Sequence, residues 1–313
     1  MDVKQLRTLV AIADAGSVTR AAVLLNIVQP AVSRHIKLLE EDLGTVLFDR
    51  NRNGMELTDD GRTLLEYARR VLREIEQARA EIRPSRGVVG GIVTIGLLPS
   101  TCDLITNVLM REIAAAYPGI HLRFLVGYAG DLQKWLDAGD LDASLLYDIS
   151  GTPALKVRPL LEEALWVVDR PGNLVAQDVP VAFASLAEQP LILPDARHGL
   201  RALVDHQAAL AGVRLRIAAE TNAMSVQKSL VVGGHGMTIL PSVAVVDEVA
   251  RGILVCAPLV APQVLRKIVL AMPTNRLAGT PVRMVVATLL TSIQALIDGG
   301  YWKSANWLDS DPL

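Results

Sequence analysis

Residues 17–36 read SVTRAAVLLNIVQPAVSRHI, and this stretch decides the fold of the N-terminal part of the chain. Ser17 has the side-chain oxygen that a helix N-cap requires, and the alanines and leucines that follow supply a short apolar face up to Asn26. Pro30 suits the first turn of a second helix, because its missing amide is not needed there. The pattern predicts two helices joined by a tight turn.

The second of these helices has two distinct faces. Its apolar positions recur after four, three and four residues and must face a core; they are Val32, Ile36, Leu39 and Leu43. The side chains left on the opposite face are Pro30, Ser33, Arg34 and Lys37. That outer face is short, polar and basic.

The flanking residues complete a small domain. An amphipathic helix over 3–15 precedes the pair and is closed by Gly16. Two short apolar runs at 46–48 and 55–57 enclose Asn53-Gly54, a strong hairpin turn signal. Three helices followed by a hairpin predict a winged helix-turn-helix.

A long helix is predicted after the hairpin. Thr58 is its N-cap, and Pro84 ends it. Apolar residues recur in coiled-coil spacing at Leu64, Ala68, Val71, Ile75, Ala78 and Ile82. This seam either joins two copies of the chain or packs on its own domain. We favour dimerisation, because the remaining faces of the helix are strongly charged.

The composition changes beyond a glycine-containing hinge at 84–91. Apolar runs at 92–98, 120–126 and 141–147 alternate with helical patterns at 101–116 and 131–138, which predicts a parallel sheet. A second set of strands is expected at 165–168, 191–193, 214–218 and 237–240, with helices near 200–210 and 223–232. Two α/β halves are predicted.

The overall composition limits the class of protein. The 313 residues are 51% hydrophobic and 20% charged, with no secretory signal and no uninterrupted apolar span, so we expect a globular cytoplasmic protein without a membrane segment. Cys102 and Cys256 match neither a disulfide framework nor a metal site. The net charge of −2 argues against a nucleic-acid partner. However, residues 1–37 hold 5 Lys and Arg against 2 Asp and Glu.

The N-terminal residues resemble the DNA-binding region of LysR-type transcriptional regulators. The resemblance rests on the ordered segments Ser17–Ala22, Leu25-Asn26, Gln29–Ile36, Leu38–Glu40, Leu43-Gly44, Leu47-Phe48 and Leu57-Thr58. The resemblance extends to the whole chain, because the chain length, the long helix and the C-terminal α/β half also match the family. Val28 departs from the pattern, since the family often has Ser or Thr there.

The resemblance implies an α/β fold in three parts. These are a winged helix-turn-helix domain (1–58), a linker and dimerisation helix (59–86), and an effector domain (91–300) similar to type 2 periplasmic binding proteins. Subdomain I would comprise 91–160 and 268–300, and subdomain II 161–267. The implied function is a sequence-specific regulator of double-stranded promoter DNA, a homodimer or homotetramer that senses a small metabolite and also contacts RNA polymerase.

The expected DNA contacts follow from the resemblance and from side-chain chemistry. They are Ser17, Arg20, Gln29, Pro30, Ser33, Arg34, Lys37, Arg50 and Arg52. Arg34 can pair with a guanine edge and Gln29 with an adenine edge, while Lys37 and the two wing arginines suit phosphates. Each residue taken singly is also compatible with an ordinary solvated surface.

The expected effector contacts lie at strand-to-helix junctions. They are Ser100, Thr101, Tyr128, Arg197, His198 and Arg201. Hydroxyls and amides at a helix N-terminus, or arginines, can receive a carboxylate, but simple helix capping and a solvated loop remain equally good interpretations. No metal or cofactor is expected. The five histidines form no catalytic motif, which argues against an enzyme. A transport binding protein would leave the first 90 residues without a role.

Overall fold

The computed structural model describes residues 1–51, 54–82, 89–147, 153–196, 198–274 and 278–308. The three N-terminal helices are α1 (Val3–Ala15), α2 (Val18–Leu25) and α3 (Gln29–Leu43). They end at Gly16, Asn26 and Gly44, whose φ angles of 64°, 53° and 69° place them in the left-handed region. These helix-stop positions confirm the predicted helix-turn-helix.

The wing packs back on the turn between α1 and α2. It is the antiparallel pair β1 (Phe48–Asn51) and β2 (Gly54–Leu57). The Met55 amide donates to the Gly16 carbonyl at 3.2 Å. Gly54 has a φ of 130°, and a Cβ there would lie 2.5 Å from the same oxygen. Glycine is therefore required at this close approach.

The long helix α4 (Asp59–Ile82) is present, and the Thr58 hydroxyl accepts a hydrogen bond from the Gly61 amide at 3.0 Å. Leu64 and Ala68 pack into the core of the helix-turn-helix domain, whereas Val71 is exposed. Leu64 and Ala68 therefore complete the chain's own domain, and the expected dimer contact through the rest of the seam stays a prediction.

The predicted β-α-β-α-β unit is confirmed in subdomain I. Its elements are β3 (Gly90–Leu97), α5 (Pro99–Ala116), β4 (Gly119–Val126), α6 (Ala129–Asp137) and β5 (Ala143–Tyr147). Strand β3 pairs in parallel with both β4 and β5. Apolar side chains of β3, α5 and β5 form the core of this subdomain.

Two long antiparallel strands cross between the subdomains, β6 (Leu155–Asp169) and β12 (Leu265–Pro273). After Ala164, β6 leaves β12 and pairs with β10 (Thr238–Pro241) and β11 (Val255–Val260). The expected boundary after residue 160 thus falls inside a continuous strand, of which the sequence pattern indicated only 165–168.

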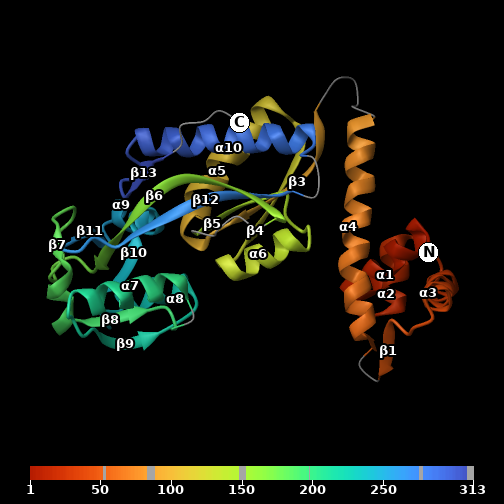
Figure 1. Cartoon of the computed structure of the whole chain (residues 1–313), viewed down its shortest axis with the longest axis horizontal. Coiled ribbons are helices and arrows are strands. Elements are labelled where there is room, and N and C mark those ends of the chain that lie inside the picture. The colour runs from red at the N-terminus through yellow and green to blue at the C-terminus, as the bar shows by residue number, and fades with distance from the viewer. Residues whose placement is uncertain (52–53, 83–88, 148–152, 197, 275–277, 309–313) are drawn as a thin grey trace.

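Subdomain II contains the parallel pair β8 (Pro190–Leu193) and β9 (Arg216–Glu220) with helices α7 (Gly199–Leu210) and α8 (Met224–Val232) (Figure 1). The remaining elements are β7 (Val181–Ala182), the 3-10 helices η2 (Phe183–Glu188) and η3 (Ser242–Val245), α9 (Val246–Ala250), α10 (Thr280–Asp298) and β13 (Ala305–Trp307).

Helix α10 lies along subdomain I, beside α5 (Figure 1). Within the described residues it is the one helix with the length and apolar composition of a membrane span. Half of that span is buried, and its Val285, Leu289 and Ile293 belong to the core of subdomain I. Its apolar composition is thus accounted for by packing in the fold.

Candidate DNA-binding face and effector site

Helix α3 presents the predicted outer face. Val32, Ile36 and Leu39 are buried in the domain core, whereas Leu43, which was also expected to face the core, is exposed. The opposite residues Gln29, Pro30, Arg34 and Lys37 are exposed, and Ser33 is half-buried. Arg34 makes no hydrogen bond or ion pair with any other residue that the structure describes, so its guanidinium is available to a base edge. Lys37 lies 3.6 Å from Glu41 on the same helix.

The start of α2 adds two further candidates. Ser17 occupies the predicted N-cap position, but its hydroxyl makes no capping hydrogen bond. Arg20 is exposed one turn later. His35, by contrast, is engaged within the domain, because its Nδ1 lies 3.0 Å from the Thr8 hydroxyl.

The wing arginines are less well defined. Arg50 lies on β1 opposite Met55, and Arg52 lies outside the described residues. The described part of the predicted DNA site is therefore the face formed by α2 and α3.

A buried ion pair lies where β6 and β12 cross between the subdomains. Arg266 Nε donates to Glu163 Oε2 at 2.7 Å, and Trp302 Nε1 donates to the other carboxylate oxygen at 2.7 Å. The side chains of Arg266 and Glu163 are only 3% and 0% exposed. The Glu163 carboxylate is therefore held from both sides.

Arg266 links this pair to the N-terminus of α5. Its guanidinium lies 4.1 Å from the ring centroid of Tyr147, and its Nη2 donates to Ser100 Oγ at 3.3 Å. The Ser100 and Tyr147 hydroxyls are 3.1 Å apart. Burial raises the pKa of Tyr147, so this hydroxyl stays protonated. Ser100, Tyr147 and Arg266 thus form one hydrogen-bonded group near the crossing strands β6 and β12.

Tyr128 joins subdomain I to subdomain II. Its hydroxyl donates to the Asn222 carbonyl at 2.5 Å, and its ring meets the His198 ring edge-on at 4.6 Å. Burial raises the pKa of Tyr128. Burial and then the positive charge of Arg266 lower the pKa of His198, which favours a neutral imidazole. We call Ser100, Tyr128, Tyr147, His198 and Arg266 the junction cluster.

The other expected effector residues have structural partners or lie elsewhere. The Thr101 hydroxyl is buried and donates to the Leu98 carbonyl at 3.0 Å. Arg201 pairs with Asp205 at 2.9 Å and with Glu220 at 2.5 Å, so its charge is already neutralised. Arg197 lies outside the described residues. Thr101 and Arg201 are therefore left out of the junction cluster.

Sequence reasoning missed Arg266 and Glu163. No strand was expected at 265–273, and Glu163 interrupts the apolar pattern of β6. Glu163 and Arg266 are the buried members of the charged pairs Glu162-Glu163 and Arg266-Lys267, and the sequence does not show which member of each pair faces inward. Their roles become clear only once the pairing of the two strands is known.

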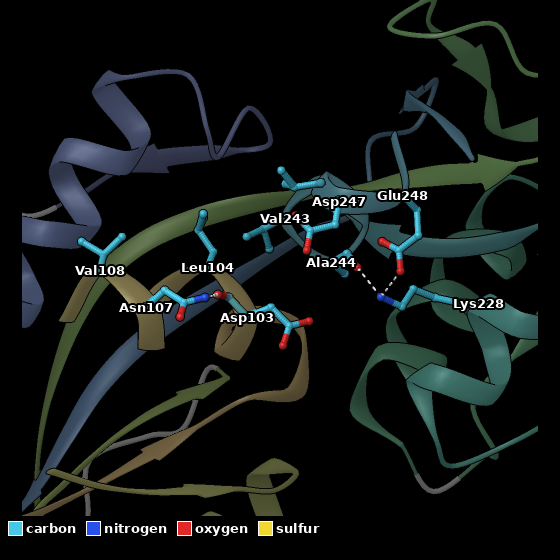
Figure 2. Close-up of a pocket in the computed structure, with 10 residues that line it drawn as sticks. Asp103, Leu104, Asn107, Val108, Lys228, Val243, Ala244, Asp247 and Glu248 are labelled. Atoms are coloured by element: carbon cyan, nitrogen blue, oxygen red, sulfur yellow. Dashed lines mark hydrogen bonds and ion pairs between the residues drawn. The ribbon is translucent and has the colours of Figure 1, made fainter. Parts of the chain in front are cut away.

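A cavity of about 230 Å³ lies between α5, α8 and the η3–α9 segment. Figure 2 shows Asp103 and Asn107 on α5 facing Lys228 on α8 and Glu248 on α9. Lys228 Nζ lies 2.6 Å from Glu248 and donates to the Ala244 carbonyl at 3.2 Å. Because Asp103 and Asp247 add further negative charge, this cavity disfavours an anion.

The linker helix contacts subdomain I directly. Arg73 of α4 lies 2.8 Å from Asp140 and donates to the Ala138 carbonyl at 3.0 Å. Both partners lie just after α6, whose N-cap residue is Tyr128. One helix of nine residues thus connects the junction cluster with the linker helix.

No group of three or more His, Cys, Asp or Glu side chains that could hold a metal occurs among the described residues. The two thiols lie in different cores, Cys102 in subdomain I and Cys256 in subdomain II. Burial raises the pKa of Cys102 to about 11 and also raises the pKa of Cys256. Both sulfurs are therefore protonated at neutral pH.

Two family models account for nearly the whole chain. Residues 3–62 match the bacterial regulatory helix-turn-helix protein, lysR family, and residues 86–294 match the LysR substrate binding domain. The nitrogen assimilation regulatory protein nac of Klebsiella aerogenes is 32% identical over 248 residues, which cover 78% of this chain and 79% of that protein. The DNA-binding transcriptional dual regulator OxyR of Escherichia coli is 27% identical over 303 residues, which cover 97% of this chain and 98% of that protein.

Solved structures share the fold along the whole chain. A full-length OxyR from Pseudomonas aeruginosa superposes with a TM-score of 0.73 at 21% identity, covering 100% of this chain and 99% of that one. Full-length CbnR in complex with its target DNA gives a TM-score of 0.69 at 22% identity, covering 94% and 99%. The chain therefore belongs to the LysR family of transcriptional regulators.

Proposed function

We propose that this LysR-type regulator reads promoter DNA with the exposed face of α3, and that a small anionic metabolite bound at the junction cluster changes its action there. The DNA-reading role is supported by the exposed basic face of α3. On this face Arg34 has no hydrogen-bond or ion-pair partner among the described residues. The proposal also places the protein in the cytoplasm and gives it no metal, cofactor or catalytic role.

The roles of the proposed DNA-contacting residues follow from their side-chain chemistry and their positions on the domain. Arg34, Gln29 and Ser33 would contact base edges in the major groove, where hydrogen-bond patterns differ between base pairs. Ser17 and Arg20 at the start of α2, with Lys37, Arg50 and Arg52, would contact phosphates and set the register. Because one domain has few basic residues, tight binding requires two or four copies acting together.

Exposed apolar side chains on α4 would supply the dimer contact that this requirement needs. Tyr67 and Val71 are exposed, and neither is among the α4 residues that pack in the helix-turn-helix core, which include Leu64, Ala68 and Leu72. The family resemblance and the CbnR complex with target DNA support a homodimer or homotetramer. A contact with RNA polymerase belongs to the same proposal, since a promoter-bound regulator acts on transcription.

The effector assignment is supported by chemistry at the junction cluster. Ser100 lies in the first turn of α5, where the helix dipole favours negative charge. Arg266, whose charge Glu163 balances, adds hydrogen-bond donors beside Ser100, and Tyr128 and His198 come from opposite subdomains. An anion placed here would touch both subdomains and so favour one arrangement of them over others.

Helix α6 supports a route from the effector to the DNA-binding domain. A ligand that moves Tyr128 moves the N-terminus of α6, and the residues after its C-terminus hold Arg73 of α4. Because a short helix transmits displacement as a rigid rod, the linker helix would shift with it. The coupling thus uses packed elements that both sites contact.

A thiol-based peroxide sensor is the second candidate, because a hydrogen peroxide-inducible genes activator is among the relatives. The raised pKa of both thiols argues against it, since the thiolate is the reactive form. The two cysteines also lie in separate cores. We therefore favour a metabolite over an oxidant.

The test combines DNA selection with ligand screening on the full chain. Duplexes selected from a random library should bind with strong dependence on salt, and scrambled duplexes should bind much more weakly. Small carboxylates should then be screened for an increase in melting temperature, since a ligand of the folded state stabilises it. Ser100→Ala should abolish that increase while DNA selection persists. Failure to enrich any sequence would refute the DNA-reading role.

A further inference from the structure

Val28 is an unusual residue for the place it occupies. It is the N-cap of α3, where Ser, Thr, Asp or Asn normally bonds a free helix amide, and its side chain makes no such bond. It is also 69% exposed. Neither capping nor burial in the described domain therefore explains a valine here.

The surroundings of Val28 place it beside the proposed reading face. Its carbonyl accepts the Ala31 amide at 3.0 Å, which fixes Val28 against the first turn of α3. Gln29 and Pro30 follow and are both exposed. In helix-turn-helix proteins the N-terminal residues of the second helix are the ones that reach base edges. The exposed side chains of Val28 and Pro30 thus supply an apolar edge at the N-terminal end of that face.

Major-groove chemistry offers one apolar feature for such an edge. Thymine alone among the four bases carries a C5 methyl group, which aliphatic side chains contact, whereas every other distinguishing group there is a hydrogen-bond donor or acceptor. An isopropyl group cannot use the donors and acceptors. Its favourable contact is therefore with the methyl group.

We propose that Val28, together with Pro30, is a specificity-determining residue that reads the C5 methyl group of a thymine in each half-site, beside the base that Gln29 contacts. This inference rests on the proposed role of α3 in reading DNA. It adds an apolar readout to the hydrogen bonds that Arg34 and Gln29 supply.

The test uses the full chain and duplexes selected by the wild-type protein. Each thymine in turn is replaced by deoxyuridine, which removes only the methyl group. One position per half-site should weaken binding about fourfold, as expected for loss of one buried methyl group at roughly 0.8 kcal/mol. A 5-methylcytosine at the same position should bind better than cytosine.

Variants assign the effect to the side chain. Val28→Ala should bind the thymine and deoxyuridine duplexes equally, and Val28→Thr, which has the same shape but a hydroxyl in place of a methyl group, should reduce the difference. Val23→Ala is the matched control, because Val23 is a similarly exposed valine (77%) that belongs to α2 and not to α3, and it should keep the full fourfold difference. Circular dichroism checks that each variant is folded.

Two results would overturn this inference and leave the proposed function intact. Either the wild-type protein binds every deoxyuridine duplex as tightly as the thymine duplex, or Val28→Ala keeps the discrimination. If the wild-type protein enriches no sequence at all, the proposed function itself fails and this inference falls with it.

Discussion

Arg73 on the linker helix lies 2.8 Å from Asp140, three residues beyond the end of α6. The two side chains are 29% and 26% exposed, so solvent partly screens the pair. Its contribution to the free energy of unfolding should be about 0.5 kcal/mol. The pair is thus better placed to orient the linker helix than to stabilise the fold.

Asp140→Asn should therefore weaken coupling and leave stability nearly intact. We expect the change in promoter affinity produced by the effector to shrink several-fold, because α6 no longer holds the linker helix firmly. Fluorescence anisotropy with and without the stabilising carboxylate measures this change. Asp14→Asn is the control, since Asp14 pairs with Arg69 at 2.6 Å within the helix-turn-helix unit. An unchanged response in Asp140→Asn would contradict the α6 route.

The buried pair at the crossing strands should behave differently. Arg266→Met leaves the Glu163 carboxylate in the interior with Trp302 as its remaining partner. Removing one member of a buried pair costs about 3–5 kcal/mol, because the other charge stays unpaired. Urea unfolding of the full chain measures the loss.

The double variant Glu163→Gln/Arg266→Met removes both charges and should recover part of that loss. Asp178→Asn, which breaks an exposed pair with Lys303, should cost less than about 1 kcal/mol. A loss for Arg266→Met as small as that of Asp178→Asn would show that the buried pair does not hold the junction.

The sequence predicted the three N-terminal helices almost residue by residue, because their signals are local, whereas the first wing strand lies at Phe48–Asn51 and not at the expected 46–48. Gly16, Asn26 and Gly44 end the helices by adopting positive φ, and each is read without knowledge of the rest of the fold. Pro30 similarly marks the first turn of α3. Such signals depend on the backbone of a few neighbouring residues.

The junction cluster could be predicted only in part, because its contacts are non-local. Arg266 and Glu163 are 103 residues apart, and nothing in either strand specifies the other. Ser100, Tyr128 and His198 were found because they lie at strand-to-helix junctions, a rule of topology that sequence can apply. Arg201 also lies at such a junction, but it is ion-paired with Asp205 and Glu220.

His198 predicts a dependence of stability on pH. Burial is the main reason why the pKa of His198 is lowered in the folded state. When the pH falls below the ordinary histidine pKa, the unfolded chain therefore binds a proton at this residue while the folded chain does not. This residue therefore contributes stability above about pH 6.5 that is lost as the pH falls toward its folded pKa. His198→Asn removes the titration and keeps an N-cap acceptor for the Leu200 amide.

Urea unfolding at pH 7.5 and pH 5.5 tests this linkage. The wild-type protein should lose more free energy of unfolding on acidification than His198→Asn does. Equal losses in the two proteins would mean that burial of His198 does not oppose its protonation.

Cys102 should be chemically quiet. With a pKa of about 11, only about one thiol in several thousand is ionised at pH 7.5. We expect alkylation by iodoacetamide to be far slower than for free cysteine, and peroxide to leave promoter affinity unchanged. Mass spectrometry and anisotropy measure the two effects. A peroxide response that disappears in Cys102→Ser would instead favour the thiol-sensor alternative.

Arg34 and Lys37 provide the sharpest test of how α3 reads DNA. Both are exposed on the same face one turn apart, but Arg34 has no partner among the described residues and Lys37 already lies near Glu41. A planar guanidinium can bond a guanine edge in bidentate fashion, and loss of such a pair costs about 1–3 kcal/mol of discrimination. Arg34→Ala should therefore weaken binding to the selected duplex by that amount and hardly affect a scrambled one.

Lys37→Ala should weaken binding to both duplexes alike and lower the salt dependence, because a phosphate contact carries no sequence information. Arg34→Lys separates charge from shape, since an ammonium keeps the charge but loses the planar fork. It should leave binding to the scrambled duplex unchanged and restore only part of the binding to the selected one. Equal losses on both duplexes for Arg34→Ala would mean that Arg34 contacts the backbone, and base reading would then rest on Gln29, Ser33 and the apolar edge of Val28.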